Sequence, residues 1–88
     1  SHARVVAIQA LARTGRVELG ADLATIWTVS TGDIATRQQA LLATLALDPR
    51  LGERVLLTRL PDADAQPVLH GFAMDLIAER GLRAPEEL

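Results

Sequence analysis

The stretch DIATRQQALLATLALDP, residues 33–49, decides the fold class that we expect for this chain. Its first residue, Asp33, suits a helix N-cap because its carboxylate can accept a hydrogen bond from an orphan amide of the first turn. Apolar side chains then recur at helical spacing and form one face for a core; they are Ile34, Leu41, Leu42 and Leu45. Asp48 and Pro49 end this pattern, so the stretch predicts one amphipathic helix.

Four further helices are expected on either side of this one, because helical apolar spacing continues in both directions. Their predicted ranges are 3–14, 19–30, 51–60 and 67–80. Gly15 and Gly81 follow the first and the last of these helices, where a glycine commonly forms the C-terminal cap. Pro61 stops the fourth helix, whereas Pro67 is tolerated in the first turn of the fifth, where its missing amide hydrogen has no partner to lose. The chain is therefore predicted to be all-α, with about five helices.

Length and composition indicate one small domain with an aliphatic core. The chain has 88 residues, of which 49% are hydrophobic, but it contains only one Trp, one Phe and no Tyr. Leu, Ala, Val and Ile must therefore form the core, and Ala and Leu also favour helix. We assign the domain to residues 3–81. Ser1 and His2 are interpreted as the remnant of a purification tag, and residues 82–88 as a C-terminal tail.

Charge and residue usage disfavour several classes of protein. The net charge of -2 argues against a general attraction to nucleic acid or to anionic membranes, which requires a net basic surface. The absence of cysteine excludes disulfides and thiolate metal sites, and it fits the cytoplasm. No apolar run approaches the roughly 20 residues that span a bilayer. All nine basic residues are arginines, which is typical of a GC-rich bacterial genome. We therefore expect a bacterial, cytoplasmic protein with no membrane partner.

An internal repeat with a period of 33 residues connects the predicted helices. Sliding the chain by this period superposes Ala7, Ala40 and Ala73. The same shift aligns two further sets, which are Ile8 with Leu41 and Met74, and Arg4 with Arg37 and His70. A period of this length with two helices in each repeat is typical of a helical solenoid. The first, third and fifth predicted helices would then occupy one structural position, and the second and fourth would occupy the other.

The motif that carries this repeat resembles the HEAT family. Residues 33–43, DIATRQQALLA, are similar to the second helix of a HEAT repeat, in which an Asp is followed by an Arg, a small residue and then alternating Ala and Leu. Residues 4–11, RVVAIQAL, resemble this pattern without its Asp, and the third copy has Gln66 and His70 in place of Asp and Arg. The resemblance implies a short right-handed stack of antiparallel helical hairpins, a HEAT-like α-solenoid fragment of about two and a half repeats.

A solenoid of this length leaves apolar surface at its ends. Each helical pair covers its apolar face only by stacking on a neighbouring pair, and stability usually requires about three repeats or a capping element. Three alternatives therefore stay open. The end repeats depart from the pattern and act as caps, the domain associates with another molecule, or a longer parent chain continues the stack.

Four residues are candidates for contact with a partner. A solenoid would align Arg4, Arg37 and His70 along one ridge, which suits an acidic partner. As an alternative, Arg37 acts only within its own helix, by pairing with Asp33 one turn earlier. Trp27 lies on the apolar stripe of the second helix and is interpreted as a core residue. If Trp27 were exposed, it would be the best anchor for a partner, because large aromatic side chains dominate binding energy.

No set of residues has the pattern of a catalytic, metal or cofactor site. Asp62 and Asp64 could open a calcium-binding loop, but Pro67 and Ala73 stand where the turn glycine and the bidentate glutamate belong. His70 lacks the further Cys or His ligands of a zinc site, and Asp75, five residues on, points away from it as an orienting carboxylate. The polar loop that contains the two aspartates is interpreted as a solvated loop with a cap for the fifth helix.

These observations together predict a non-catalytic interaction or scaffold module, without a cofactor, that forms part of a larger protein. Its expected partner is another protein or a neighbouring domain. The alternative is a self-association or docking domain that forms a homodimer. A HEAT-like domain that binds nucleic acid is disfavoured, because the chain is short, mildly acidic and poor in aromatic residues.

Overall fold

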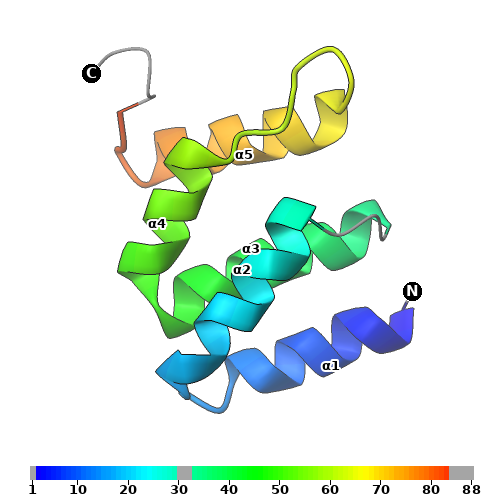
Figure 1. Ribbon diagram of the computed structural model, residues 1–88, viewed down its shortest axis with the longest axis vertical. Helices are drawn as coiled ribbons and strands as arrows, with labels where there is room; N and C mark the ends of the chain where they lie inside the picture. Colours follow the sequence, from blue (N-terminus) through cyan, green and yellow to red (C-terminus); the bar gives the residue numbers. More distant parts are fainter. Residues whose placement is uncertain (1, 30–32, 84–88) are drawn as a thin grey trace.

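The computed structural model describes residues 2–29 and 33–83, except the side chain of Val29, and all regular structure in these ranges is helical (Figure 1). In chain order the elements are α1 (His2–Ala12), the short 3-10 helix η1 (Val17–Leu19), α2 (Gly20–Val29), α3 (Ile34–Leu47), α4 (Pro49–Thr58) and α5 (Pro67–Glu79). The prediction of an all-α chain with about five helices is confirmed.

Two aspartates begin helices by the capping chemistry that their positions predict. The carboxylate of Asp33 accepts a hydrogen bond of 2.7 Å from the amide of Thr36, and α3 begins at the next residue after Asp33. Asp48 accepts a hydrogen bond of 3.2 Å from the amide of Leu51. Because Asp48 caps α4 and Pro49 fills its first position, α4 begins two residues earlier than the predicted start at Leu51.

Gly81 follows α5 as predicted, with a φ angle of 68° in the left-handed region. Gly15 also has a positive φ of 71°, but α1 ends three residues earlier, at Ala12. After α5, the amide of Gly81 donates to the carbonyl of Ala78 (3.2 Å) and the amide of Leu82 donates to the carbonyl of Ile77 (2.9 Å). These two bonds form a Schellman motif, which satisfies carbonyls at the helix end. Of the predicted tail, the structure describes only Leu82 and Arg83.

Other boundaries differ from the prediction at the helix ends. The predicted second helix, 19–30, is preceded by η1 and becomes α-helical only at Gly20, while its last residue lies outside the described residues. The first helix begins at His2, so it includes a residue that the sequence assigned to a tag remnant. Helices α1 and α4 each end two residues before their predicted ends.

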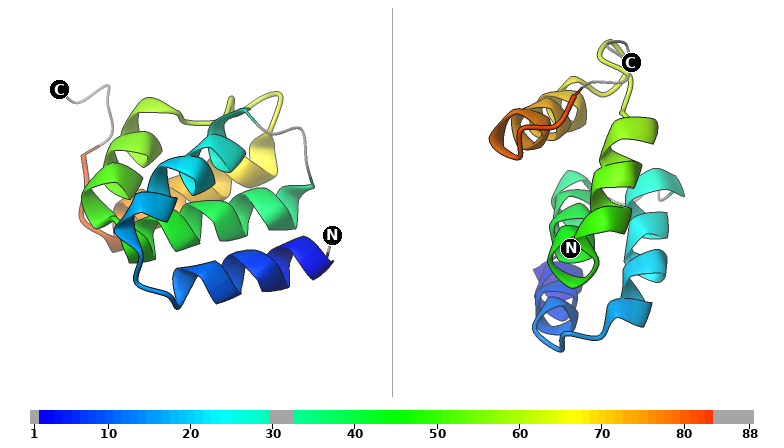
Figure 2. Two further views of the ribbon diagram at one scale, coloured as in Figure 1. Left: turned by 60° about the horizontal axis from the view of Figure 1, so that its bottom comes forward. Right: turned by 90° about the vertical axis from the view of Figure 1, so that its left-hand side faces the viewer.

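The helices form two layers. Helices α1, α3 and α5 lie side by side and run in the same direction, and α2 and α4 lie in front of them in Figure 1. The right-hand view of Figure 2 shows the two layers edge on. Helix α3 is central, because it contacts each of the other four helices. The first layer therefore ends in α1 at one edge of the molecule and in α5 at the other.

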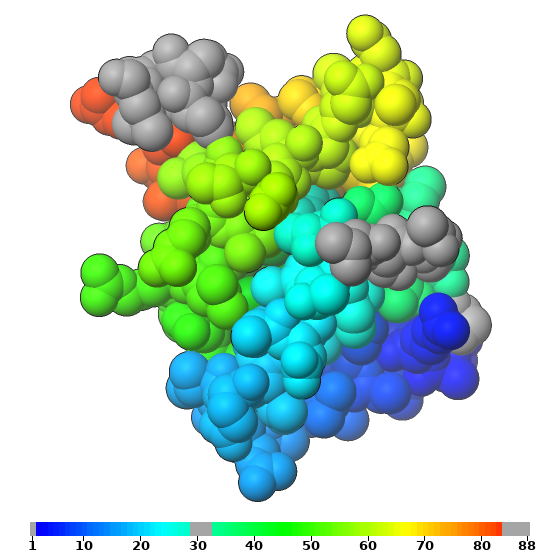
Figure 3. Space-filling view, in the orientation of Figure 1, coloured from blue at the N-terminus to red at the C-terminus, as the bar shows by residue number. Residues whose placement is uncertain are grey.

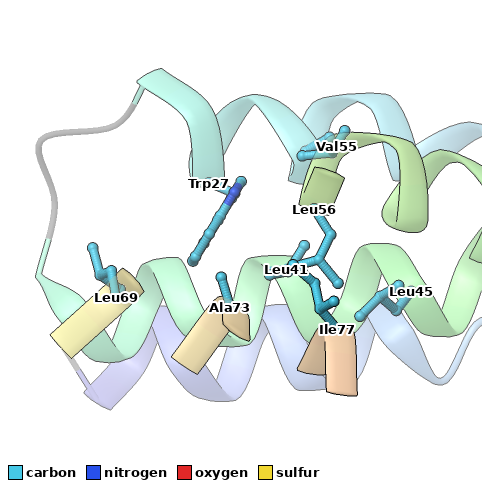
Figure 4. Close-up of a cluster of buried hydrophobic side chains, with 9 residues drawn as sticks. Trp27, Leu41, Leu45, Val55, Leu56, Leu69, Ala73 and Ile77 are labelled. Carbon is cyan, nitrogen blue, oxygen red and sulfur yellow. The ribbon is translucent and has the colours of Figure 1, made fainter. Parts of the chain in front are cut away.

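The core consists of two apolar clusters that meet at α3. The smaller cluster joins α1, α2 and α3, and its buried members are Ile8, Leu23, Ala40, Ala43 and Leu47. The larger cluster joins α2, α3, α4 and α5 (Figure 4), and its buried members are Ala24, Trp27, Leu41, Leu45, Val55, Leu56, Leu69, Ala73 and Ile77. Helix α3 contributes to both clusters from different faces, so it holds the two halves of the molecule together.

A glycine lies at the crossing of α3 and α4. Gly52 is buried within α4, and a Cβ atom added to it would lie 2.9 Å from the Cα of Leu45. Backbone atoms cannot move away as a flexible side chain can, so only glycine fits this crossing without a shift of one helix.

Candidate functional site

The three residues of the predicted ridge lie at one end of the first layer. Arg4, Arg37 and His70 belong to the amino-terminal halves of α1, α3 and α5, and these helices start at the same side of the molecule (Figure 1). The layer therefore brings the three positions to one edge. Their side chains nevertheless differ in what they contact.

Arg37 binds the carboxyl end of α2. Its Nε and Nη2 atoms donate hydrogen bonds of 3.2 Å and 2.8 Å to the carbonyl oxygen of Trp27, and its guanidinium carbon lies 5.8 Å from the Trp27 ring centroid. The last carbonyls of a helix have no partner within the helix and carry partial negative charge. The half-buried guanidinium thus supplies both the donors and the positive charge that this end of α2 lacks.

The predicted pair between Asp33 and Arg37 is wrong. No ion pair joins these two side chains in the described ranges, and the carboxylate of Asp33 caps the start of α3 instead. A pair one turn apart on a helix surface is worth only a few tenths of a kcal/mol, whereas two charged hydrogen bonds to a helix end are worth more. The stronger partner of Arg37 comes from another helix.

His70 makes a similar contact from α5. Its Nδ1 lies 2.9 Å from the carbonyl oxygen of Pro61, and because a carbonyl can only accept, this bond requires the proton on Nδ1. Arg37 binds a carbonyl ten residues earlier in the chain, and His70 binds one nine residues earlier. Both side chains therefore connect the first layer to the segment that ends the preceding helix of the second layer.

Trp27 lies in the core. Its side chain is 1% exposed and packs against Phe72 with ring centroids 6.2 Å apart. Its indole Nε1 is buried and has no hydrogen-bond partner in the part of the chain that the structure describes. The exposure that a partner anchor would need is absent from Trp27 in this chain, in keeping with the interpretation of Trp27 as a core residue.

A polar hollow of about 390 Å³ lies where α2 and α4 end. Trp27 and Arg37 line it together with Arg59, Asp62 and Gln66. The carboxylate of Asp62 already accepts hydrogen bonds from the amides of Asp64 (3.1 Å) and Ala65 (2.7 Å). Asp62 therefore holds its own loop, and the predicted cap of α5 is wrong, because Gln66 stands at that position without a side-chain cap.

The described residues do not form a metal site. Nowhere in residues 2–29 and 33–83 do three or more His, Cys, Asp or Glu side chains gather closely enough to hold an ion. The hollow has two of its charged side chains, Arg37 and Asp62, already bound to backbone groups of this chain. It is best explained as a structural junction.

Helix α1 exposes apolar side chains on the side away from the core. Of its 11 residues, only Ile8 is buried, although most of the helix is apolar. We define the outer face of α1 as the exposed apolar residues on the side opposite Ile8, which are Ala3, Val6 and Ala10. Val6 is 48% exposed. A helix that is apolar all round is normally buried on every side, but no residue that the structure describes covers this face.

Helix α5 has a corresponding outer face at the opposite edge of the molecule. Its buried residues, Leu69, Ala73 and Ile77, form one narrow stripe. The exposed residues that point away from this stripe define the outer face of α5, and they are Val68, Gly71, Asp75, Ala78 and Glu79. In the space-filling view α1, in blue, and α5, in yellow and orange, form the two ends of the molecule (Figure 3).

Sequence reasoning did not assign the two outer faces to named residues. Residues 5–12, VVAIQALA, indicate such a face, because seven of these eight side chains are apolar and cannot all face one core. The predicted contact residues were instead the basic ridge of Arg4, Arg37 and His70. In the structure, Arg37 and His70 bind backbone carbonyl groups of this chain.

No protein-family model matches this chain, and no curated protein or solved structure shows detectable similarity to it. Within the described ranges, no helix has the length and apolar character needed to cross a membrane.

Proposed function

We propose that this chain is a HEAT-like helical-repeat module that binds another protein or a neighbouring domain and has no catalytic role of its own. The outer face of α1 carries this proposal. Contiguous apolar surface that remains exposed on a folded chain usually marks a site of protein interaction. Three alanine and valine side chains on one helix face, Ala3, Val6 and Ala10, provide such a surface.

The repeat part of this proposal is supported by the order of the layers and by the contacts of the repeated positions. Residues 33 apart lie in α1, α3 and α5, which are adjacent in one layer. Arg37 and His70, which are equivalent in the repeat, each bind a carbonyl about one helix earlier. Stacked repeats bury a continuous core and leave the outer faces of the first and last helices for a further contact.

A pull-down with paired variants tests the proposal. Wild type, Ala10→Glu and Ala46→Glu serve as baits in a lysate of the source organism. Ala10 and Ala46 are both exposed alanines in the last turn of a helix, so the two variants carry the same chemical change on different helices. We expect the wild type and Ala46→Glu to retain a protein that Ala10→Glu loses, because a buried unpaired charge opposes binding.

Cross-linking with mass spectrometry should map the retained protein to α1. If all three baits retain the same proteins, or if the wild type retains none, the proposed use of the outer face of α1 is wrong.

A further inference from the structure

We propose that the outer face of α1 binds a second copy of this chain, through the outer face of α5 of that copy, so that the molecules associate head to tail. This inference rests on the proposed function, and it names the partner. Three features support it: the contact that α1 makes with α3 within the chain, the exposed outer face of α5, and the charges on or beside the outer faces of α1 and α5.

The contact between α1 and α3 provides a template for the interface. Ile8 of α1 packs in one cluster with Ala40 and Ala43 of α3, and Gln9 Nε2 lies 3.4 Å from Gln39 Oε1. The residues 33 positions before Ala40 and Ala43 are Ala7 and Ala10; Ala10 lies on the outer face of α1, and Ala7 is exposed beside it, next to a hollow that Ile26 and Thr36 also line. Helix α1 therefore presents to solvent the same small side chains with which α3 receives a parallel neighbour.

Helix α5 provides the position for such a neighbour. It is the last helix of the layer and runs in the same direction as α1 and α3 (Figure 1), so an α1 helix from a second copy would continue the layer in the existing direction. Its outer face carries the small residues Gly71 and Ala78, and a Cβ atom added to Gly71 would meet no atom within 4 Å. Val68, which is 56% exposed, adds apolar area beside them.

The charges on or beside the two outer faces are opposite. Arg13 follows α1 directly, while Arg16 pairs with Glu18 (3.4 Å). The outer face of α5 carries Asp75 and Glu79; of the arginines that follow α5, Arg80 pairs with Glu53 of α4 (2.9 Å) and Arg83 lies beyond the helix end. Arg13, Asp75 and Glu79 are exposed and make no ion pair with any residue that the structure describes.

This charge distribution favours α1 against α5 over α1 against α1. A symmetric dimer through α1 would bring the Arg13 side chains of two copies near the same interface, whereas a head-to-tail contact brings Arg13 of one copy to the face that carries Asp75 and Glu79 of the other. A head-to-tail contact does not use up both ends of a molecule, so it repeats from copy to copy unless it closes into a ring. One helix against another buries less than a standard interface of about 1,600 Å², so we expect weak association that depends on concentration.

Sedimentation equilibrium from micromolar to millimolar concentration tests the proposal, with two variants that each block one end. Ala10→Glu places a negative charge on the face that would meet acidic α5, and Gly71→Arg places a positive charge on the face that would meet basic α1. Both positions are exposed, so circular dichroism should show unchanged helix content. Ala46→Glu is the control for added charge elsewhere.

We expect the average mass of the wild type and of Ala46→Glu to rise with concentration beyond that of a dimer. Each blocked variant alone should stay monomeric, with association weakened at least about tenfold. An equimolar mixture of the two variants should form a dimer that does not grow further, because one intact α5 face meets one intact α1 face.

Three results would overturn head-to-tail association: a wild type that stays monomeric at millimolar concentration, a Gly71→Arg variant that dimerises alone, or a mixture of blocked variants that stays monomeric while the wild type associates. If the wild type is monomeric but Ala10→Glu still loses a different protein in the pull-down, the proposed function stands and only this inference falls. If both experiments fail, both proposals fall.

Discussion

Arg37 stabilises the end of one helix from a position in the next helix. Its two hydrogen bonds to the Trp27 carbonyl place a positive charge where the α2 dipole is negative. The same guanidinium lies over the face of the Trp27 ring, so it also covers the largest side chain of the core. The position of Arg37 is therefore explained by contacts within the chain.

Replacing Arg37 by methionine should lower the free energy of unfolding by about 1.5 kcal/mol, because the helix end loses charged hydrogen bonds while the apolar stem is kept. Urea denaturation followed by circular dichroism measures this change. Arg50→Met is the matched control, since Arg50 is exposed on α4 and its loss should change stability by less than about 0.5 kcal/mol. Equal effects of the two substitutions would show that the contact of Arg37 with α2 contributes nothing.

At the scale of the helices, the sequence predicted features that depend on local chemistry. The cap at Asp33, the glycine end at Gly81 and the start of α5 at Pro67 depend on a few neighbouring residues, and all three are found. The partner of Arg37 could not be predicted in the same way, because Trp27 lies ten residues away and comes near only when α2 packs on α3. The outer faces were missed for the same reason, since exposure depends on which helices lack a neighbour.

The crossing of α3 and α4 depends on Gly52 in a way that helix propensity alone would not suggest. Alanine is favoured over glycine inside a helix by about 0.8–1 kcal/mol. At Gly52, however, the added methyl group would lie 2.6 Å from Leu45 Cδ2 and 2.9 Å from its Cα, so we expect Gly52→Ala to destabilise the chain by about 1–3 kcal/mol.

Gly71→Ala is the matched control for this substitution, because Gly71 also lies within a helix but faces open space. It should stabilise the chain by up to about 1 kcal/mol. Thermal or urea denaturation of both variants measures the difference. A stabilising effect of Gly52→Ala would mean that α3 and α4 cross less closely than the structure indicates.

At the scale of the whole molecule, the central position of α3 makes the stability of the chain uneven. Helix α3 contacts all four other helices and has seven buried residues, whereas α1 has one. An element that packs against few neighbours opens more readily than one packed on several sides. The two outer faces proposed for binding thus belong to the helices that have the fewest neighbours.

Hydrogen exchange of backbone amides should show this difference directly. In dilute solution we expect the amides of α3 to exchange slowest and those of α1 at least about tenfold faster, because α1 contributes one buried side chain to the core and α3 contributes seven. At high protein concentration, head-to-tail association should slow exchange in α1 and α5 and leave α2 and α4 nearly unchanged, since binding stabilises only the helices at the interface. Equal protection of α1 and α3 in dilute solution would contradict the proposed weakness of the α1 edge. Slower exchange at high concentration in α2 and α4 alone would place the contact between copies on the second layer instead.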